Sequence, residues 1–261
     1  MESSIDATVR EASARTLVIV PTYNEIENLP LIAEAVFRAG DFHLLIVDDG
    51  SPDGTGDLAE KLKREHPGRF DVIHRAGKLG LGTAYVAGFR HALARGYDFV
   101  IQMDCDFSHD PRALPQLLAA ALNADVAIGS RYVSGGSTPG WPLLRRIISR
   151  GGSLYAKLVL GVGINDVTGG FRCCRRTTLE AIDLDSLQVT GFGFQVELNY
   201  RCHQRGLKIV EVPITFVDRR VGTSKMSSGI FLEALTMVWK LRFSGGDSTG
   251  NRGNGFRSAG K

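Results

Sequence analysis

The chain has 261 residues, of which 43% are hydrophobic and 23% charged, and this balance is typical of a folded globular protein. The formal net charge of +3 is too small to predict nucleic-acid binding, and we expect none. The sequence contains no uninterrupted apolar stretch of about 18 residues, which argues against a membrane-spanning helix. The four cysteines lack C-x-x-C spacing, so we expect reduced thiols in a cytoplasmic protein and no zinc site.

The first half of the chain alternates short β-branched runs with helical patterns. This alternation predicts an α/β fold with a mostly parallel central sheet, right-handed crossovers and helices on its faces. Residues 1–15 are polar without a turn-by-turn pattern, and residues 244–261 are rich in Gly, Ser, Asn and Arg, so both are predicted to be flexible tails. The predicted strands cover about 16–20, 43–48, 70–74, 98–103 and 125–129, and the predicted helices about 26–39, 55–65, 83–95 and 111–123.

The alternation stops near residue 131, although we expect residues 16–243 to form a single domain. A basic apolar segment, 141–163, comes next and contains no acidic residue in its first 20 positions. The last predicted helix is amphipathic and ends in cations, so it either faces the core, which is the favoured interpretation, or lies along a membrane or partner. The remaining predicted elements are a strand-like stretch at 165–175, a helix near 194–205, a strand at 207–214 and a helix near 229–243.

Acidic pairs follow two of the predicted strands. Asp104 and Asp106 end the apolar run 97–103, and Asp48 and Asp49 end another. Two carboxylates spaced i, i+2 beside a buried strand repel each other, and a hard divalent cation such as Mg²⁺ or Mn²⁺ removes that penalty. An isolated pair of this kind is more often a solvated turn. Two acidic strand ends in one α/β unit instead predict a phosphorylated ligand at the carboxyl edge of the sheet.

Three further clusters stand near predicted strand ends. The run 21–25, Pro-Thr-Tyr-Asn-Glu, places an aromatic ring and a carboxylate where they can hold a nucleobase and a ribose hydroxyl; alternatively, Asn24 caps the next helix. The glycine-rich run 77–82 resembles a phosphate cradle but matches no established loop pattern, so alone it is weak evidence. His109, beside the second acidic pair, is interpreted as a structural partner rather than a metal ligand.

These motifs together resemble family 2 glycosyltransferases of the GT-A fold, over about residues 16–243. Four later motifs narrow the resemblance to the polyprenyl-phosphate (dolichyl-phosphate) mannose synthases. The resemblance implies an inverting, metal-dependent enzyme that transfers mannose from GDP-mannose to a polyprenyl phosphate lipid, giving a β-linked lipid-borne mannose. The four motifs are Gly129–Tyr132, Asp166–Arg172, Gly191–Glu197 and Phe216–Lys225.

On the donor side, the resemblance implies a guanosine pocket and a metal that bridges the diphosphate. Asp49 either contacts the ribose or caps a turn, and Lys78 lies near the pocket. Ser108 stands at the third ligand position, where many members of the family carry Gln, so a water can replace that ligand. The pocket residues are Pro21, Tyr23, Glu25 and Asp48, and the residues expected to bind Mg²⁺ or Mn²⁺ are Asp104, Asp106 and Ser108.

On the acceptor side, Arg131, Arg145 and Ser149 match positions that grip the acceptor phosphate. Arg219 and Lys225 match a mobile basic loop that closes over the donor diphosphate. Because phosphate dianions accept bidentate hydrogen bonds from guanidinium groups, Arg at these positions suits the implied chemistry.

The implied acceptor is insoluble, so the protein must reach a bilayer. The apolar residues Trp141, Leu143, Leu144, Ile147 and Ile148, together with neighbouring arginines, are expected to lie at the membrane interface. We therefore expect a peripheral protein on the cytoplasmic face of a membrane, and a small membrane-anchoring partner protein is a further expectation. The alternatives are transfer of glucose from UDP-glucose to the same lipid, nucleotidyl transfer, and a non-catalytic nucleotide- or membrane-binding module.

Overall fold

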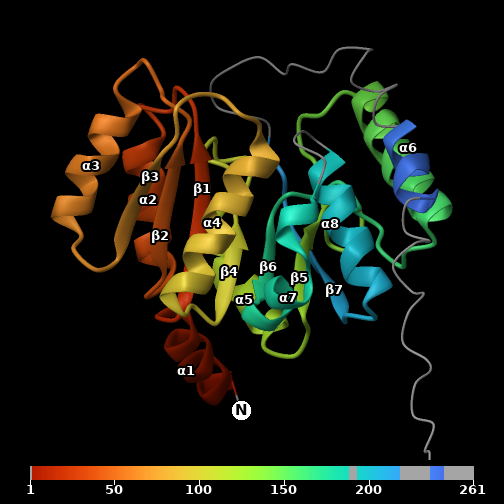
Figure 1. Ribbon diagram of the computed structural model, residues 1–261. Coiled ribbons are helices and arrows are strands. Elements are labelled where there is room, and N and C mark those ends of the chain that lie inside the picture. Colours follow the sequence, from red (N-terminus) through yellow and green to blue (C-terminus); the bar gives the residue numbers. More distant parts are fainter. Residues whose placement is uncertain (1, 188–192, 218–235, 244–261) are drawn as a thin grey trace, which may run out of the picture.

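A seven-stranded sheet with helices on both faces forms the centre of the molecule (Figure 1). The computed structural model describes residues 2–187, 193–217 and 236–243. The strand order is β3-β2-β1-β4-β6-β5-β7, and β6 alone runs antiparallel to its neighbours. The predicted α/β fold with a mostly parallel sheet is confirmed. The strands are β1 Thr16–Thr22, β2 His43–Asp48, β3 Phe70–His74, β4 Phe99–Gln102, β5 Val126–Ser130, β6 Arg172–Arg175 and β7 Ile209–Pro213.

The helices form two layers, one on each face of the sheet. Since the central strands are buried on both faces, they read as continuous apolar runs rather than as alternating ones. One core cluster lies under α2 and α5, and the other lies under α4 and α8. The helices are α1 Glu2–Ser13, α2 Leu29–Ala39, α3 Thr55–Glu65, α4 Leu81–Arg95, η1 Pro111–Ala113, α5 Leu114–Ala121, α6 Leu143–Leu160, α7 Arg176–Ala181, η2 Leu184–Ser186 and α8 Gly193–Gln204, with a further helical segment at 236–243.

The topology brings several loops to one edge of the sheet. β1, β2 and β4 are parallel, so the segments that follow them all leave at the carboxyl edge. β6 runs the other way and begins at this edge, where Arg172 pairs with Gln102 at the end of β4. α8 precedes β7, which is parallel to β5, so α8 also begins near this edge. The loops that carry the sequence motifs therefore meet at one edge.

Several predicted boundaries differ from the structure; the strand-like stretch expected at 165–175, for example, is a strand only over Arg172–Arg175. Residues 1–15 were expected to be a flexible tail, but α1 is helical, Val9 and Ser13 are buried, and the helix contacts α5. Although residues 1–15 are mostly polar, the apolar Val9 side chain packs against the core and holds the helix there. β1 extends past the predicted residue 20 to Thr22, because Pro21 pairs with Val47 where β4 has already ended and no hydrogen bond from the proline nitrogen is needed.

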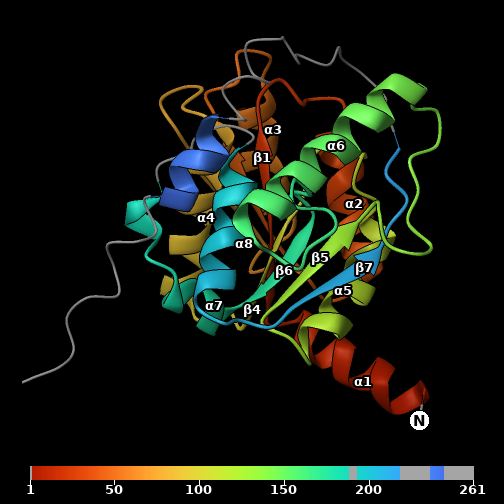
Figure 2. The same cartoon turned by 90° about the vertical axis from the view of Figure 1, so that its right-hand side faces the viewer.

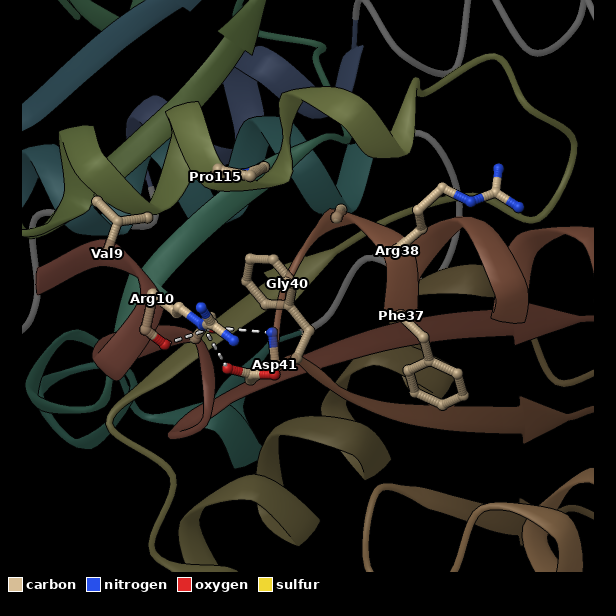
Figure 3. A pocket seen from close by; sticks show the side chains of 10 residues that line it. Val9, Arg10, Phe37, Arg38, Gly40, Asp41 and Pro115 are labelled. Carbon is tan, nitrogen blue, oxygen red and sulfur yellow. Dashed lines mark hydrogen bonds and ion pairs between the residues drawn. The ribbon is translucent and has the colours of Figure 1, made fainter. Parts of the chain in front are cut away.

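A cavity of about 350 Å³ lies beside the amino-terminal ends of β1 and β2, away from the motif-bearing edge (Figure 3). Its polar groups already bind one another. Arg10 pairs with Asp41 at 3.3 Å, and the Ser13 hydroxyl accepts from the Asp41 amide at 3.0 Å and donates to the Arg10 carbonyl. These contacts therefore connect α1 to the turn between α2 and β2, and they do not favour the cavity as a site for a charged ligand.

Candidate active site

The loop after β4 presents the acidic pair. The Asp104 backbone N–H donates to Nδ1 of His109 at 3.1 Å, and Oδ1 of Asp104 accepts from the Tyr85 hydroxyl at 3.3 Å. Oδ1 of Asp106 accepts from the Ser108 backbone N–H at 3.0 Å. Both carboxylates thus accept hydrogen bonds, Asp104 from Tyr85 on α4 and Asp106 from its own loop, and the Asp104 side chain stays one-third exposed.

Two buried side chains, His109 and Tyr85, hold this loop from the interior of the protein. His109 is buried and stacks on Phe171 at 4.8 Å between ring centroids. Burial lowers the pKa of His109, so the ring is neutral and its Nδ1 can accept the hydrogen bond from Asp104. Burial also raises the pKa of Tyr85 well above its ordinary value, so the phenol remains a donor. These contacts support the structural interpretation of His109, which stays a prediction.

The oxygen atoms of this loop fit a hard divalent cation. Asp104 and Asp106 supply carboxylates, and Oγ of Ser108 is buried without a hydrogen-bond partner in the described part of the chain. An unpaired buried hydroxyl needs a ligand or a water, and it stands at the expected third position. No cluster of three His, Cys, Asp or Glu side chains suitable for a metal occurs among the described residues.

Asp48 ties the loop after β2 together. Its side chain accepts from the Thr22 hydroxyl at 3.0 Å and from both the backbone N–H and the hydroxyl of Ser51. A Cβ on Gly56 would lie 3.1 Å from Oδ2 of Asp48, so the close approach of α3 requires glycine there. Asp48 is therefore held rigidly at the carboxyl edge.

Asp49 is committed to a residue that the sequence did not single out. Its carboxylate lies 2.7 Å from Nε of Arg75, and both side chains are less than a tenth exposed. Burial raises the pKa of Asp49, and the attraction of Arg75 offsets only part of that effect. The contact of Asp49 in the structure is a buried ion pair, and its expected contact with the ribose stays a prediction. Arg75 directly follows β3, and that position was its signal in the sequence.

The loop after β1 carries the aromatic half of the predicted nucleoside pocket. Lys78 Nζ lies 4.6 Å from the centroid of the Tyr23 ring, and Tyr23 is 38% exposed. Glu25 accepts from the Asn28 side chain at 2.8 Å. Asn24 adopts φ 63° and its N–H donates to the Ser51 hydroxyl, so it joins two loops and does not cap α2. The residues expected to hold guanosine are thus on adjacent loops.

Arg131 is fixed by a buried carboxylate. Its Nε and Nη2 donate to Asp166 at 2.7 and 2.6 Å, and Nη2 also donates to the Thr168 hydroxyl. Asp166 is fully buried, and the Arg131 side chain is one-tenth exposed. Burial opposes the charge of Arg131, but its hydrogen bonds to Asp166 and the charge of that carboxylate outweigh burial and raise the pKa of the guanidinium. Asp166 was visible in the sequence only as part of a motif.

Arg145 and Ser149 lie on the first turns of α6. Arg145 stands over the Trp141 ring at 4.0 Å, and the Ser149 hydroxyl accepts from the Tyr132 hydroxyl at 2.6 Å. Since Arg131 also lies 5.7 Å from the Trp141 ring, the expected acceptor residues are gathered in one place. The sequence placed Trp141 on an exposed membrane face, and this was wrong: the ring is only 7% exposed because it is enclosed by these arginines and by Phe216.

The expected site residues thus divide into donor-side and acceptor-side groups along one edge. Arg219 and Lys225, predicted to close over the donor diphosphate, lie outside the described residues.

Comparison with known proteins gives the site a family. Residues 17–183 match the model of the family described as Glycosyl transferase family 2. The chain belongs to glycosyl transferase family 2. It is 50% identical over 240 residues to a polyprenol monophosphomannose synthase of Mycolicibacterium smegmatis, with 90% of each chain covered. It is 52% identical over 230 residues to an undecaprenyl-phosphate mannosyltransferase of Micrococcus luteus, covering 87% of this chain and 94% of the relative.

Solved structures confirm the fold of this family 2 protein. The mannosyltransferase PcManGT of Pyrobaculum calidifontis, solved in complex with GDP-Man and Mn²⁺, aligns with a TM-score of 0.55 over 95% of this chain and 75% of its own. The sequence identity is 15%, so this likeness supports the GT-A fold alone.

Proposed function

We propose that this protein transfers mannose from GDP-mannose to a polyprenyl phosphate with inversion, giving a β-linked mannosyl lipid phosphate. One observation carries the proposal: a carboxylate pair and an arginine pair lie at the same sheet edge, with Arg145 and Arg131 lying 4.0 and 5.7 Å from the ring of one tryptophan. The two close relatives act, by name, on a polyprenol phosphate and an undecaprenyl phosphate. Both names specify mannose, which does not favour the alternative of glucose transfer from UDP-glucose.

The donor would lie across the edge from β2 toward β5. Tyr23, Lys78 and Asp48 offer a ring, a cation and a fixed carboxylate to the nucleoside end. Asp104 and Asp106, which follow β4, would come next, and the sugar would then lie toward Arg131. The order of the strands therefore separates the leaving nucleotide from the acceptor.

The nucleophile would be an oxygen of the acceptor phosphate monoester. Its second pKa is about 6, so it is mostly dianionic at neutral pH and needs no strong general base. The Ser149 hydroxyl accepts from Tyr132 and keeps its own proton to donate to the phosphate. With saturating donor, the rate should fall as the pH drops through about 6, because the dianion is lost. A rate unchanged from pH 7 to pH 5 would contradict this nucleophile.

Asp104, Asp106 and Ser108 would hold Mg²⁺ or Mn²⁺. When bound, such an ion supplies positive charge that stabilises the departing diphosphate. The buried, unpaired Ser108 hydroxyl supports its inclusion in the site. The choice between the two metals stays open, as does the closing role of Arg219 and Lys225.

α6 supports peripheral membrane binding, because its outward face is apolar. Leu143, Ile147 and Leu158 are 72%, 58% and 72% exposed, and they recur on one side of the helix. Arg146 and Arg150 flank this stripe, and the helix has no acidic residue. Figures 1 and 2 show α6 on the outside of the half that contains β5 and β7. An apolar stripe beside cations suits an anionic lipid surface.

No helix in the described ranges is long and apolar enough to cross a bilayer. The four cysteines are buried and unpaired, which supports a reducing compartment and hence the cytoplasmic face. The small membrane-anchoring partner stays a prediction.

Flotation with liposomes tests the membrane surface. Replacing Leu143, Ile147 and Leu158 by Ser should abolish flotation with anionic vesicles and leave thermal melting unchanged, because these side chains face outward. Ser replacement of the exposed Leu79, on a loop of the donor side, is the matched control and should have little effect. Equal flotation of all proteins would overturn the assignment of this face.

The function itself is tested by incubating the protein with GDP-mannose and a short-chain polyprenyl phosphate, with and without EDTA, and reading products by mass spectrometry. A mannosyl lipid phosphate should form, and EDTA should abolish it. A parallel incubation with UDP-glucose should give no product. Absence of product with GDP-mannose and added metal would contradict the proposal.

A further inference from the structure

Trp141 contacts both arginines of the acceptor side. Its ring centroid is 4.0 Å from the Arg145 guanidinium carbon and 5.7 Å from that of Arg131. Phe216 meets the same ring edge to face at 5.5 Å, and only 7% of Trp141 is exposed. The buried indole ring thus makes cation–π contacts with both guanidinium groups.

The indole nitrogen of Trp141 is an unsatisfied donor. Nε1 is buried, and it has no hydrogen-bond partner in the part of the chain that the structure describes. An indole N–H can donate but cannot accept, so only an acceptor atom can satisfy it. Buried donors without partners are rare in folded proteins, and a bound ligand or a water is the usual reason for one.

Among the described residues, the groups near Trp141 favour an anion. α6 begins two residues later and has no side-chain cap at its N-terminus, so its first N–H groups add positive potential there. α6 carries no acidic residue. Asp166 is the carboxylate that faces Arg131, and its two oxygens are already occupied by that guanidinium and the Arg131 backbone N–H.

We propose that Trp141 binds the acceptor phosphate through its indole N–H, while the face of its ring holds Arg145 in position for the same phosphate. This assignment rests on the proposed function, because the phosphate is that of the lipid acceptor. It makes Trp141 a binding residue with two separable contributions: one hydrogen bond from Nε1, and one aromatic surface under the guanidinium.

Two substitutions separate these contributions. Trp141→Phe removes the N–H and keeps a ring, so KM for a short-chain polyprenyl phosphate should rise about tenfold, the effect of one charge-assisted hydrogen bond. Trp141→Leu also removes the ring and should raise it about a hundredfold. In Trp141→Phe, KM for GDP-mannose and kcat at saturating acceptor should stay at wild-type values. An unchanged acceptor KM in Trp141→Phe would overturn the indole hydrogen bond.

A binding measurement keeps the test independent of turnover and of the folding of those variants. The chain has two tryptophans, so Trp239→Phe leaves Trp141 as the only indole fluorophore. Trp239 is 48% exposed and lies in the helical segment 236–243. Titrating Trp239→Phe with the short-chain polyprenyl phosphate should change its emission in a saturable way. The corresponding polyprenol without phosphate should give no saturable change.

The outcomes distinguish this inference from the proposed function. If the polyprenol and its phosphate change the emission equally, the tryptophan senses the lipid chain and the phosphate contact is wrong. If the protein forms mannosyl lipid while the phosphate leaves the emission unchanged, the function stands and this inference fails. If the phosphate binds saturably but no mannosyl product forms with any donor, the phosphate site stands and the proposed function fails.

Discussion

The two sides of the site are built by different means. On the donor side, carboxylates at strand ends are held by contacts from nearby loops, such as Ser51 with Asp48 and Ser108 with Asp106. On the acceptor side, guanidinium groups are held by partners distant in sequence, and Arg131 reaches Asp166 across 35 positions. The donor side thus owes much of its geometry to local turns, with Thr22, Arg75 and Tyr85 adding contacts from other segments, whereas Arg131 on the acceptor side depends on tertiary packing.

This difference predicts unequal sensitivity to substitution. A local turn keeps its shape when one charged atom is exchanged, so donor-side substitutions should change chemistry more than stability. A buried ion pair between distant segments contributes to both, so acceptor-side substitutions should change stability as well. Substitutions on each side therefore test whether the two sides are stabilised differently.

The largest effect is expected from replacing both Asp104 and Asp106 by Asn. The carboxylates would no longer hold a cation against the diphosphate, and turnover should fall by about three orders of magnitude or more. The melting temperature should change little, because the amide oxygens can still accept the local hydrogen bonds. Product formation is measured by lipid extraction and mass spectrometry.

Asp110→Asn is the matched control, since Asp110 follows closely in the same loop but pairs with the exposed Arg112. It should retain turnover close to that of the wild type. Undiminished turnover in the double variant would contradict a metal-binding role for Asp104 and Asp106, and with it the proposed donor side.

The next effect is expected from Asp166→Asn, on the acceptor side. Arg131 would keep its burial but lose its counter-charge, which should cost about 3 kcal/mol of folding free energy. For a chain of this size, that corresponds to a melting temperature lower by roughly 6–12 °C. The acceptor KM should rise while the donor KM holds, because Arg131 is no longer fixed.

A double-mutant cycle identifies the cause of that loss. Arg131→Met combined with Asp166→Leu removes both charges and should recover part of the stability, although not the acceptor KM. If Asp166→Asn melts like the wild type, the ion pair does not stabilise the fold and the two sides are not built as differently as proposed.

The sequence predicted the donor side better than the acceptor side, for the same reason. Strand-end motifs such as Asp104-Cys105-Asp106 are contiguous, and a parallel sheet brings them to one edge whatever the details of packing. The predicted strands at 43–48 and 70–74 match β2 and β3. Partners joined only by the tertiary fold, such as Arg131 with Asp166 on the acceptor side, carried no sequence signal of their pairing.

Trp141 shows how composition misleads on the acceptor side. It stands in an apolar, basic run, and the neighbouring Leu143 and Ile147 are indeed exposed. Its burial follows from Phe216, which returns from β7, and from Arg131 at the end of β5. Neither contact can be inferred from periodicity, because both join segments whose spacing in sequence is unrelated to their spacing in the fold.

The smallest effect is expected from Lys78→Met, back on the donor side. Lys78 contacts an exposed part of the Tyr23 ring, so the cation–π attraction contributes only about 0.5–1 kcal/mol. KM for GDP-mannose should therefore rise roughly two- to fivefold, with the acceptor KM and the melting temperature unchanged. Lys61→Met, on the exposed surface of α3, is a control of the same chemistry and should have no effect. A shift in the acceptor KM instead would mean that the two sides communicate, which their separate local frameworks do not predict.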